Sequence, residues 1–561
     1  MRLTRGLLLL VGFLPALTFA APALHARDYD STCKRTKVAI IGGGVAGITA
    51  AQALANQSVT DFLILEYQDH IGGRMRNTKF GSDPDGNPYT VELGANWISG
   101  LGQDTNGPEN PVWTFSKQVN LTSPNSDAFS IATYNETGAV NYTYILDEFE
   151  DYWSEFEQSA GTILSENLQD RSFRAGLWQS GWRPRSDPAR KAVEYYLWDW
   201  DTAQVRAPHI YLCRHILTSG FFWRVQSPEG SSFVYGIAGY NFTYYGFSEI
   251  SNFCTDQRGF NTWLKQQASR FLEPNDSRLL LNTIVTNITY SNTGVHIVTS
   301  DGSCVEADYA ISTVSLGVLR NDAITFEPEL PEWKQSAIAT FHFGTYTKIF
   351  YQFNETFWPE DKQFFLYADP TKRGYYTVWQ SLSTEGFLPG SNIIFATVVG
   401  EQSYRIEAQD DETTKEEGME VLRKMFPNIT VPEPIAFTYP RWTQTPWSYG
   451  SYSNWPAGTT LEMHQNLRAN VGRLYFAGEA QSAQYFGFLH GAWFEGQEVG
   501  ERIAGQITTE CVNQPSGCSA YNRYEVLHGT TEFWKVNAFN GMGGSPFFVA
   551  DSVVDAEGSD A

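Results

Sequence analysis

The chain has 561 residues, of which 42% are hydrophobic and 15% aromatic, so it is a globular protein too long for one ordinary core, and we expect two domains or more. Its formal net charge of −23 excludes the basic surface that nucleic-acid binding needs. The same charge suits a cationic substrate, which negative walls attract, although an acidic, soluble surface explains it without any ligand.

The first twenty residues predict an export signal. Arg2 and Arg5 precede an apolar stretch at 6–19, and the small residues Thr18 and Ala20 stand where a signal peptidase cuts. The stretch is shorter than the roughly 20 apolar residues that a membrane-spanning helix needs. We therefore expect a secreted protein with no membrane anchor after signal removal.

A glycine loop follows between a predicted strand at 37–41 and a predicted helix at 48–56. Gly42, Gly44 and Gly47 form the pattern GxGxxG. The first glycine permits a tight turn, the second lets a pyrophosphate approach the backbone, and the third lets the helix pack on the strand. The free N–H groups at the helix start would face the phosphates. The order of these elements predicts a dinucleotide site.

The next segments narrow the choice of nucleotide. A second strand at 61–65 ends at Glu66, about 20 residues past the glycines, where a ribose partner belongs. An acid there favours FAD or NAD over NADP. In the segment 71–76, Arg74 and Arg76 follow two glycines and predict a second phosphate clamp, because arginine binds phosphate oxygens as a planar fork.

Two later regions have clear periodicity. Residues 279–311 alternate apolar and polar with turns at 291–294 and 301–302, which predicts a strand meander. Residues 411–426 predict a helix. Its expected inner face consists of Met419, Val421, Leu422 and Met425. The acidic, small-residue end at 551–561 predicts disorder.

Sequons and cysteines agree with export. Asn-x-Ser/Thr triplets begin at Asn56, Asn120, Asn135, Asn141, Asn241, Asn275, Asn287, Asn354 and Asn428. Disulfides are possible among Cys33, Cys213, Cys254, Cys304, Cys511 and Cys518. Cys511 and Cys518 are near enough to close a small loop, and the other pairings stay open. No CxxC pattern is present, and we predict no metal site.

Several motifs together resemble those of the flavin-containing amine oxidases, and within them the secreted polyamine oxidases of plants and fungi. The resemblance runs from about residue 37 to about residue 507. Its motifs are GGGVAG at 42–47, IGGRMR at 71–76, VELGANW at 91–97, DQRG at 256–259, STVSLGV at 312–318, YTKIF at 346–350, SNWP at 453–456, LYFAGE at 474–479 and HGA at 490–492.

The resemblance implies an α/β (α+β) fold in which a Rossmann-like FAD-binding domain is interleaved with a substrate-binding domain of mixed sheet and helices. The FAD-binding domain would take 36–113, 240–328 and 440–508, and the substrate-binding domain 114–239 and 329–439. The signal would take 1–20, and 509–561 would form a C-terminal extension.

The same resemblance assigns the cofactor contacts. They are Gly42, Gly44, Val45, Ala46, Gly47, Glu66, Arg74, Gly94, Ala95, Asn96, Trp97, Val285, Gly478, Glu479 and Phe488, with Leu489 beside the last. Family members that bind flavin covalently use a cysteine in the late region. The run 481–488 has none here, so the resemblance implies non-covalent FAD.

The implied reaction is the oxidation of an amine to an imine, which hydrolyses, with O2 reduced to hydrogen peroxide. Lys348 matches the lysine that holds a water against flavin N5, and the apolar Ile349 and Phe350 beside it predict its burial. A buried lysine has a lowered pKa and can handle protons. A surface lysine at a strand end is the simpler alternative.

Further residues would shape the substrate site. Tyr346, Tyr452 and Phe488 match aromatic positions near the flavin and the amine, where rings hold amines by dispersion or cation–π attraction. Asp201 aligns with a tunnel acid that binds an ammonium group, and Asp199 is its neighbour.

Two departures from the plant enzymes leave the substrate open. Ser99 replaces a tunnel glutamate and Phe488 replaces a tyrosine, which weakens the case for a polyamine. An oxidase of another amine or amino acid is one alternative, with Arg206 and Arg214 as candidate carboxylate partners. A catalytically weak flavin-binding protein is a second, and a histone demethylase conflicts with the signal. The sequence does not indicate an oligomeric state or the C–N side attacked.

Overall fold

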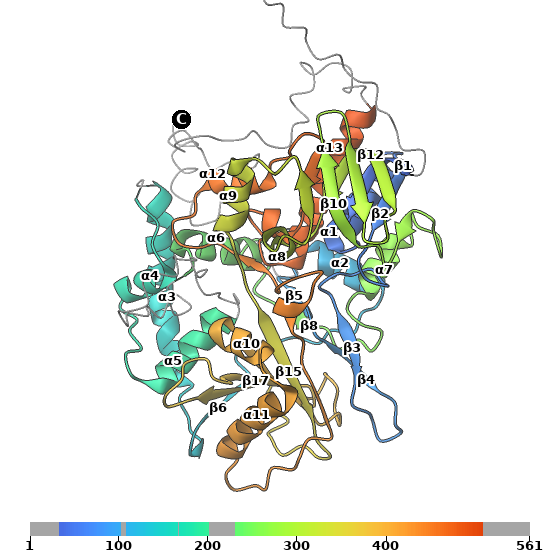
Figure 1. The fold of residues 1–561 in the computed structure, drawn as a ribbon. Helices are drawn as coiled ribbons and strands as arrows, with labels where there is room; N and C mark the ends of the chain where they lie inside the picture. The colour runs from blue at the N-terminus through green and yellow to red at the C-terminus, as the bar shows by residue number, and fades with distance from the viewer. Residues whose placement is uncertain (1–32, 103–107, 166–167, 201–229, 509–561) are drawn as a thin grey trace, which may run out of the picture.

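The structure is a computed structural model that describes residues 33–102, 108–165, 168–200 and 230–508 (Figure 1). Two large sheets dominate it. Figure 1 shows the eight-stranded sheet with α1 and α13 in the upper half, and the seven-stranded sheet with α10 and α11 in the lower half. The observed mixture of parallel and antiparallel strands with helices confirms the predicted α/β class.

The eight-stranded sheet collects strands from distant parts of the chain. Its order is β13-β10-β11-β12-β1-β2-β9, with β21 also paired to β12. The strands are β1 (Lys34–Ile41), β2 (Phe62–Leu65), β9 (Leu279–Leu280), β10 (Val285–Tyr290), β11 (Val295–Thr299), β12 (Cys304–Ser312), β13 (Thr325–Glu327) and β21 (Leu474–Phe476). The antiparallel strands β10, β11 and β12 confirm the predicted meander, except that its first part, β9, pairs with β2 at the other edge of the sheet.

The predicted strand, turn, helix and strand around the glycine loop are all present. β1 pairs in parallel with β2 and β12, and α1 (Val45–Asn56) lies between β1 and β2 in sequence. Alternate residues of β1 enter different cores: Val38 and Ile40 pack with α1, and Ala39 and Ile41 pack on the other face. A parallel strand that is buried on both faces requires this apolar sequence.

Helix α13 (Leu489–Thr508) lies against α1 at very short range. A Cβ added at Gly496 would lie 2.3 Å from the carbonyl oxygen of Ala46, and one at Gly500 would lie 2.5 Å from that of Ala50. The two glycines therefore permit a contact between helix backbones that holds the start of α1 in place.

The seven-stranded sheet has the order β19-β15-β18-β17-β16-β6-β7 and is antiparallel except between β16 and β6. The strands are β6 (Ile131–Asn135), β7 (Gly138–Ala139), β15 (Tyr346–Gln352), β16 (Phe364–Ala368), β17 (Val378–Ser381), β18 (Ile393–Val399) and β19 (Ala436–Thr438). Helix α11 (Asp411–Met425) confirms the predicted helix, and its four expected inner side chains are all buried.

The remaining elements connect and cover the sheets. The helices are α2 (Pro111–Gln118), α3 (Tyr144–Ser165), α4 (Phe173–Gln179), α5 (Pro188–Glu194), α6 (Phe233–Tyr244), α7 (Thr262–Ala268), α8 (Leu316–Arg320), α9 (Glu332–Thr340), α10 (Gly400–Glu407), α12 (Leu461–Arg468), the π-helix η1 (Tyr195–Trp200) and the 3-10 helices η3 (Trp442–Gln444) and η4 (Glu479–Gln481). Three short strand pairs are β3 (Asn77–Phe80) with β4 (Tyr89–Glu92), β5 (Trp97–Ser99) with β8 (Ser251–Phe253), and β14 (His342–Phe343) with β20 (Ser453–Asn454).

One disulfide joins the starts of two central strands. Cys33, next to β1, is bonded to Cys304 of β12. Cys254 is buried and carries a free thiol. Cys213, Cys511 and Cys518 lie outside the described residues. Sequence spacing could not indicate the Cys33–Cys304 pairing, because 271 residues separate the two cysteines.

Two further expectations concern the surface. Asn241 in α6 is wholly buried, so it cannot carry a glycan in the folded protein, and the prediction of a glycan site there is wrong. The other eight sequon asparagines are at least partly exposed. Within the described ranges, no helix combines the length and apolar character that crossing a membrane requires. The predicted domain boundaries and the predicted signal stay predictions.

Candidate active site

A cavity of about 1110 Å³ is lined by residues of both sheets. Its volume exceeds the roughly 300–1,000 Å³ of sites for drug-sized ligands. Nearly all the predicted site residues line it: Gly42, Gly44, Val45, Ala46, Glu66, Arg74, Gly94, Ala95, Asn96, Trp97, Val285, Tyr346, Lys348, Tyr452, Gly478, Glu479 and Phe488. Leu489 lines the cavity too, whereas Gly47, the last glycine of the loop pattern, does not.

The glycine loop presents bare backbone to this cavity. A Cβ at Gly47 would lie 1.9 Å from the Gly42 carbonyl oxygen, so no side chain fits there. At Gly44 the nearest atom to an added Cβ is the Gly73 Cα at 3.9 Å, which leaves the position open toward the cavity. The loop therefore forms a cradle into which a phosphate could approach the backbone closely.

Glu66 lies at the end of β2, as predicted. Its carboxylate accepts hydrogen bonds from the backbone N–H groups of Gly43 at 2.5 Å and Gln68 at 2.8 Å. Burial raises the pKa of Glu66. These bonds fix the carboxylate beside the loop, at the edge of the cavity where a ribose would lie.

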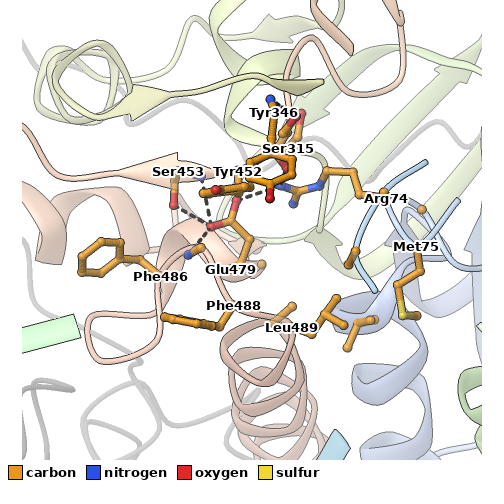
Figure 2. A pocket seen from close by; sticks show the side chains of 18 of the residues that line it. Arg74, Met75, Ser315, Tyr346, Tyr452, Ser453, Glu479, Phe486, Phe488 and Leu489 are labelled. Carbon is orange, nitrogen blue, oxygen red and sulfur yellow. Dashed lines mark hydrogen bonds and ion pairs between the residues drawn. The ribbon is translucent and has the colours of Figure 1, made fainter. Parts of the chain in front are cut away.

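Arg74 and Glu479 meet at the wall of the same cavity (Figure 2). The Nη1 of Arg74 donates to Glu479 Oε1 at 2.9 Å and to the Ser451 carbonyl at 2.7 Å. The other oxygen of Glu479 accepts from Ser453 Oγ at 2.5 Å and from Gly487 N at 2.8 Å. The pair positions the guanidinium and joins two segments that are 405 residues apart.

Lys348, in the middle of β15, is 1% exposed, so the surface-lysine alternative is wrong. Its Nζ donates to the Gly94 carbonyl at 2.6 Å, to Asn96 Oδ1 at 2.7 Å and to the Glu92 carbonyl at 3.3 Å. Burial lowers the pKa of Lys348 to about 7. A lysine with such a pKa can exchange a proton near neutral pH.

Aromatic rings surround the space next to Lys348. The Trp97 ring lies 5.2 Å from the Lys348 Nζ, and it meets Trp200 edge-on at 5.4 Å and Tyr346 at 6.5 Å. Tyr452 lies 6.1 Å from Tyr346. Sequence reasoning missed Trp200, which the π-helix η1 turns toward the cavity; its place among aromatic residues in 195–200 was the available signal.

Phe488 closes another side of the cavity. In Figure 2, Phe488 and Tyr452 lie on two sides of Glu479. The Phe488 ring stacks on His490 at 5.0 Å. Burial lowers the pKa of His490 to about 3, so this imidazole is neutral and supports Phe488 by packing.

Three further carboxylates line the cavity. Glu150 and Glu157 come from α3, and Glu249 comes from the segment before β8. Burial raises the pKa of Glu150 and of Glu157, and repulsion from Glu249 adds to both shifts. Sequence reasoning missed all three, although Glu150 and Glu157 are seven residues apart and so share one face of a helix.

Other predicted substrate residues fare differently. Ser99 lines the cavity, but Asp201, Arg206 and Arg214 lie outside the described residues. Asp199, the neighbour of Asp201, does not line the cavity: it is fully buried and forms an ion pair with Arg373, which also binds Glu194 at 2.8 Å. That cluster anchors η1 to the seven-stranded sheet.

Comparisons with known proteins agree with this geometry. The family model "Flavin containing amine oxidoreductase" matches residues 45–504. The chain is 37% identical to "Polyamine oxidase 7" of Oryza sativa subsp. japonica over 82% of this chain and 93% of that protein, and 36% identical to "Polyamine oxidase 1" of Zea mays over 88% and 95%. A solved putrescine oxidase variant superposes with a TM-score of 0.64 at 16% identity, covering 84% of this chain and 100% of that one, which shows the shared fold.

The cofactor of this family fits the residues of the cavity. The open Cβ position at Gly44, the Glu66 carboxylate and the Arg74–Glu479 pair provide backbone, ribose and phosphate partners in one space. The chain belongs to the flavin-containing amine oxidoreductases and is an FAD-dependent enzyme that oxidises small-molecule amines.

Proposed function

We propose that this enzyme is a polyamine oxidase that acts on a di- or tricationic chain such as spermidine or spermine. One observation carries the proposal: the cavity lined by Lys348 and the aromatic rings is also lined by Glu150, Glu157 and Glu249. The names of the plant relatives support the same substrate class.

The carboxylates and the aromatic rings of the cavity would have separate tasks. The carboxylates attract the distal ammonium groups, because opposite charges in a partly buried site interact more strongly than in water. Trp97, Trp200, Tyr346 and Tyr452 enclose the reacting part of the chain and exclude water. Glu150, Glu157 and Glu249 would thus provide the negative charge that is lost where Ser99 replaces a tunnel glutamate of the plant enzymes.

The overall reaction would be balanced as follows. The substrate C–N bond loses two electrons and two protons to become an imine, and water converts the imine to an aldehyde and an amine. The glycine loop, Glu66 and the Arg74–Glu479 pair would hold FAD, which we propose is non-covalent and which would supply the two-electron redox chemistry, with O2 reduced to H2O2 overall. Lys348 would hold or move a proton at its Nζ during this cycle.

A peroxide assay tests the proposal. The FAD-loaded enzyme is given spermine, spermidine, acetylated spermine, monoamines and amino acids, and the products are weighed by mass spectrometry. We expect peroxide from polyamines, and the product masses identify the C–N bond that is attacked. Peroxide only from monoamines or amino acids would refute the polyamine substrate.

We also propose that the protein is exported and N-glycosylated, on the signal-like first twenty residues and the exposed sequons. Expression in a eukaryotic host should give enzyme in the medium whose mass falls on deglycosylation. Peptide mapping should find glycans at exposed sequons and none at the buried Asn241. Retention of unglycosylated protein inside the cells would refute export.

A further inference from the structure

We propose that a second site, separate from the cavity, holds the inner N-acetylglucosamine units of an N-glycan attached to Asn56. The site is a groove of about 210 Å³ between α1, α2, α7 and α13, and Asn56 itself lines it. This inference deepens the proposed export and N-glycosylation and rests on them. It gives the sugar of one exposed sequon a defined place on the protein.

One wall of the groove is a stripe along α1. Thr49, Gln52, Ala53 and Asn56 line the groove, at the three- and four-residue spacing that places side chains on one face of a helix. The stripe is about 10 Å long at 1.5 Å per residue, a length that suits a disaccharide. Because Asn56 is the last residue of α1, a glycan would enter the groove at one end and follow the helix.

The sequon is exposed where it joins the groove. Asn56, Gln57 and Ser58 are all exposed, and Ser58, with a φ of 63°, turns the chain away from the helix. A lipid-linked diphosphate oligosaccharide is the donor that the modification requires. The bond between its anomeric carbon and the diphosphate oxygen breaks, the same carbon bonds to Asn56 Nδ2, which loses a proton, and the lipid diphosphate leaves.

The other walls combine aromatic and amide side chains. Phe115 of α2 and Trp493 of α13 are partly buried, with ring centroids 6.0 Å apart. Gln267 of α7 is 2% exposed and accepts a hydrogen bond from Gln52 at 3.4 Å. A sugar ring has C–H groups on its faces and hydroxyls at its edge. Aromatic rings pack against the faces, and amides, which both donate and accept, bond to the hydroxyls.

The charge and the size of the groove favour a small, neutral ligand. Arg270 and Glu501 are the charged residues among its described lining, and their charges cancel. Its volume is below the roughly 300–1,000 Å³ of sites for drug-sized ligands. None of the described residues that line it also lines the large cavity. A polycationic amine therefore has no matching partner here, whereas a neutral N-acetylglucosamine has one.

The covalent link favours the glycan of Asn56 over a free sugar. A small groove that is open to solvent would hold a free sugar weakly. Attachment to Asn56 makes the contact intramolecular, with an effective concentration that a dissolved sugar does not reach. The bound sugars would bridge α1 and α13, the two helices whose close contact holds the start of α1 in place.

Site-resolved deglycosylation tests the groove. The secreted, FAD-loaded enzyme is treated with peptide N-glycosidase in heavy-oxygen water, with and without prior denaturation. Mass spectrometry then follows the conversion of each sequon asparagine to labelled aspartate. In the native enzyme we expect release at Asn56 to be about tenfold slower than at the exposed Asn275, because cleavage requires the sugars to leave the groove. After denaturation the two rates should be equal.

Variants of the groove show whether its side chains cause the protection. Gln52→Ala and Gln497→Ala each remove a lining amide and leave the sequon intact, so native release at Asn56 should approach the rate at Asn275. Gln266→Ala is the matched control, at an exposed glutamine of α7 that does not line the groove, and it should keep the protection. Thermal unfolding verifies that each variant is folded.

The outcomes separate this inference from the proposed glycosylation. Three results would overturn the groove and leave glycosylation in place: equal native release at Asn56 and Asn275, protection that persists in both groove variants, or an unmodified Asn56 beside glycans at other sequons. A secreted enzyme without a glycan at any sequon would refute the proposed glycosylation and, with it, the groove.

Discussion

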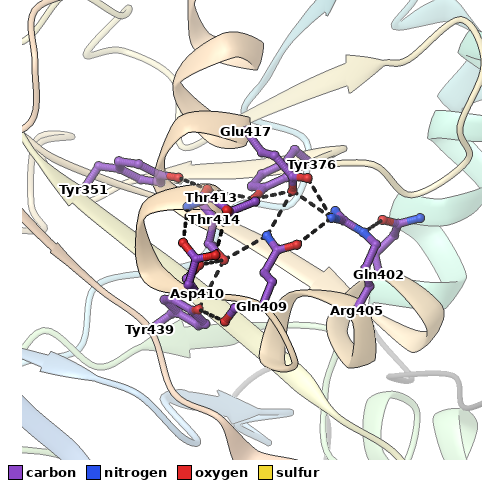
Figure 3. A network of polar contacts seen from close by, with 10 residues as sticks. All are labelled: Tyr351, Tyr376, Gln402, Arg405, Gln409, Asp410, Thr413, Thr414, Glu417 and Tyr439. Atoms are coloured by element: carbon purple, nitrogen blue, oxygen red, sulfur yellow. Dashed lines mark hydrogen bonds and ion pairs between the residues drawn. The ribbon is translucent and has the colours of Figure 1, made fainter.

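The cavity of Figure 2 and the polar network of Figure 3 are built from the same kinds of side chains, but their polar atoms have different partners. In the network between α10 and α11, Arg405 bonds to both oxygens of Glu417 at 2.8 and 2.9 Å, and Gln409 bonds to Thr414 and Glu417. In the cavity, Lys348, Glu66 and Arg74 face a space large enough for ligands.

The difference separates stability from function. Asp410 begins α11 by accepting from the Thr413 N–H at 2.8 Å, and Tyr376, just before β17, donates to the Thr414 carbonyl at 3.0 Å. The Arg405–Glu417 pair joins α10 to α11, so the network holds these two helices together. Side chains enclosed by protein on all sides stabilise the fold, whereas side chains that also line a cavity can contact a substrate or cofactor. Changes in each region should therefore affect different measurements.

The largest expected effect on the cavity side is that of Lys348→Met. We expect turnover to fall about 10²–10⁴-fold, the range for loss of a proton-transfer group. The yellow flavin spectrum should remain, because the glycine loop and the Arg74–Glu479 pair are untouched. Lys362→Met, at an exposed lysine, is the control. Turnover of Lys348→Met at the wild-type rate would remove Lys348 from the mechanism.

Two glycine variants distinguish a position that faces the cofactor, Gly44, from a position where the backbone is closely packed, Gly47. Gly44→Ala meets no protein atom closer than 3.9 Å, so the apoprotein should melt as wild type does, while FAD affinity falls about tenfold or more. Gly47→Ala places a Cβ 1.9 Å from the Gly42 carbonyl and should reduce both stability and FAD binding. Titration of apoprotein with FAD and melting curves provide the readouts. Equal stability losses in both variants would contradict an open cradle at Gly44.

On the network side, Glu417→Ala should change stability alone. It removes the partner of Arg405 and an acceptor for Gln409, and we expect a loss of about 1–2 kcal/mol because the pair is partly exposed to solvent. Thermal unfolding measures the loss, and kcat at 25 °C should match wild type. A large loss of kcat would show that the two regions are coupled.

The smallest expected effect is that of Ser99→Glu. A new carboxylate on the cavity wall should lower KM for spermine about fivefold, the scale of one partly exposed ion pair, and leave KM for a monoamine unchanged. The gain should shrink at high salt. Ser99→Gln provides a neutral side chain of the same length, and an equal gain there would show that charge is not the cause.

Sequence reasoning predicted what depends on neighbours in the chain. The strand, glycine loop, helix and Glu66 all lie within residues 34–66, and the inner face of α11 follows one helical period. It could not predict contacts between distant segments, such as Cys33 with Cys304 or Lys348 with Glu92, which are 271 and 256 residues apart. Trp200 and Glu249 were missed for the same reason, since only folding brings them to one cavity.

The alternation of the chain between the two sheets has a consequence for biosynthesis. The eight-stranded sheet is incomplete without β21, and the cavity is incomplete without Glu479 and Phe488. The ribosome adds these parts after all strands of the seven-stranded sheet. At about 5–20 residues per second, most of the chain is already made before these parts appear. Nascent chains would therefore expose an unfinished cavity until these late segments are made, and tight capture of the flavin would have to follow their synthesis.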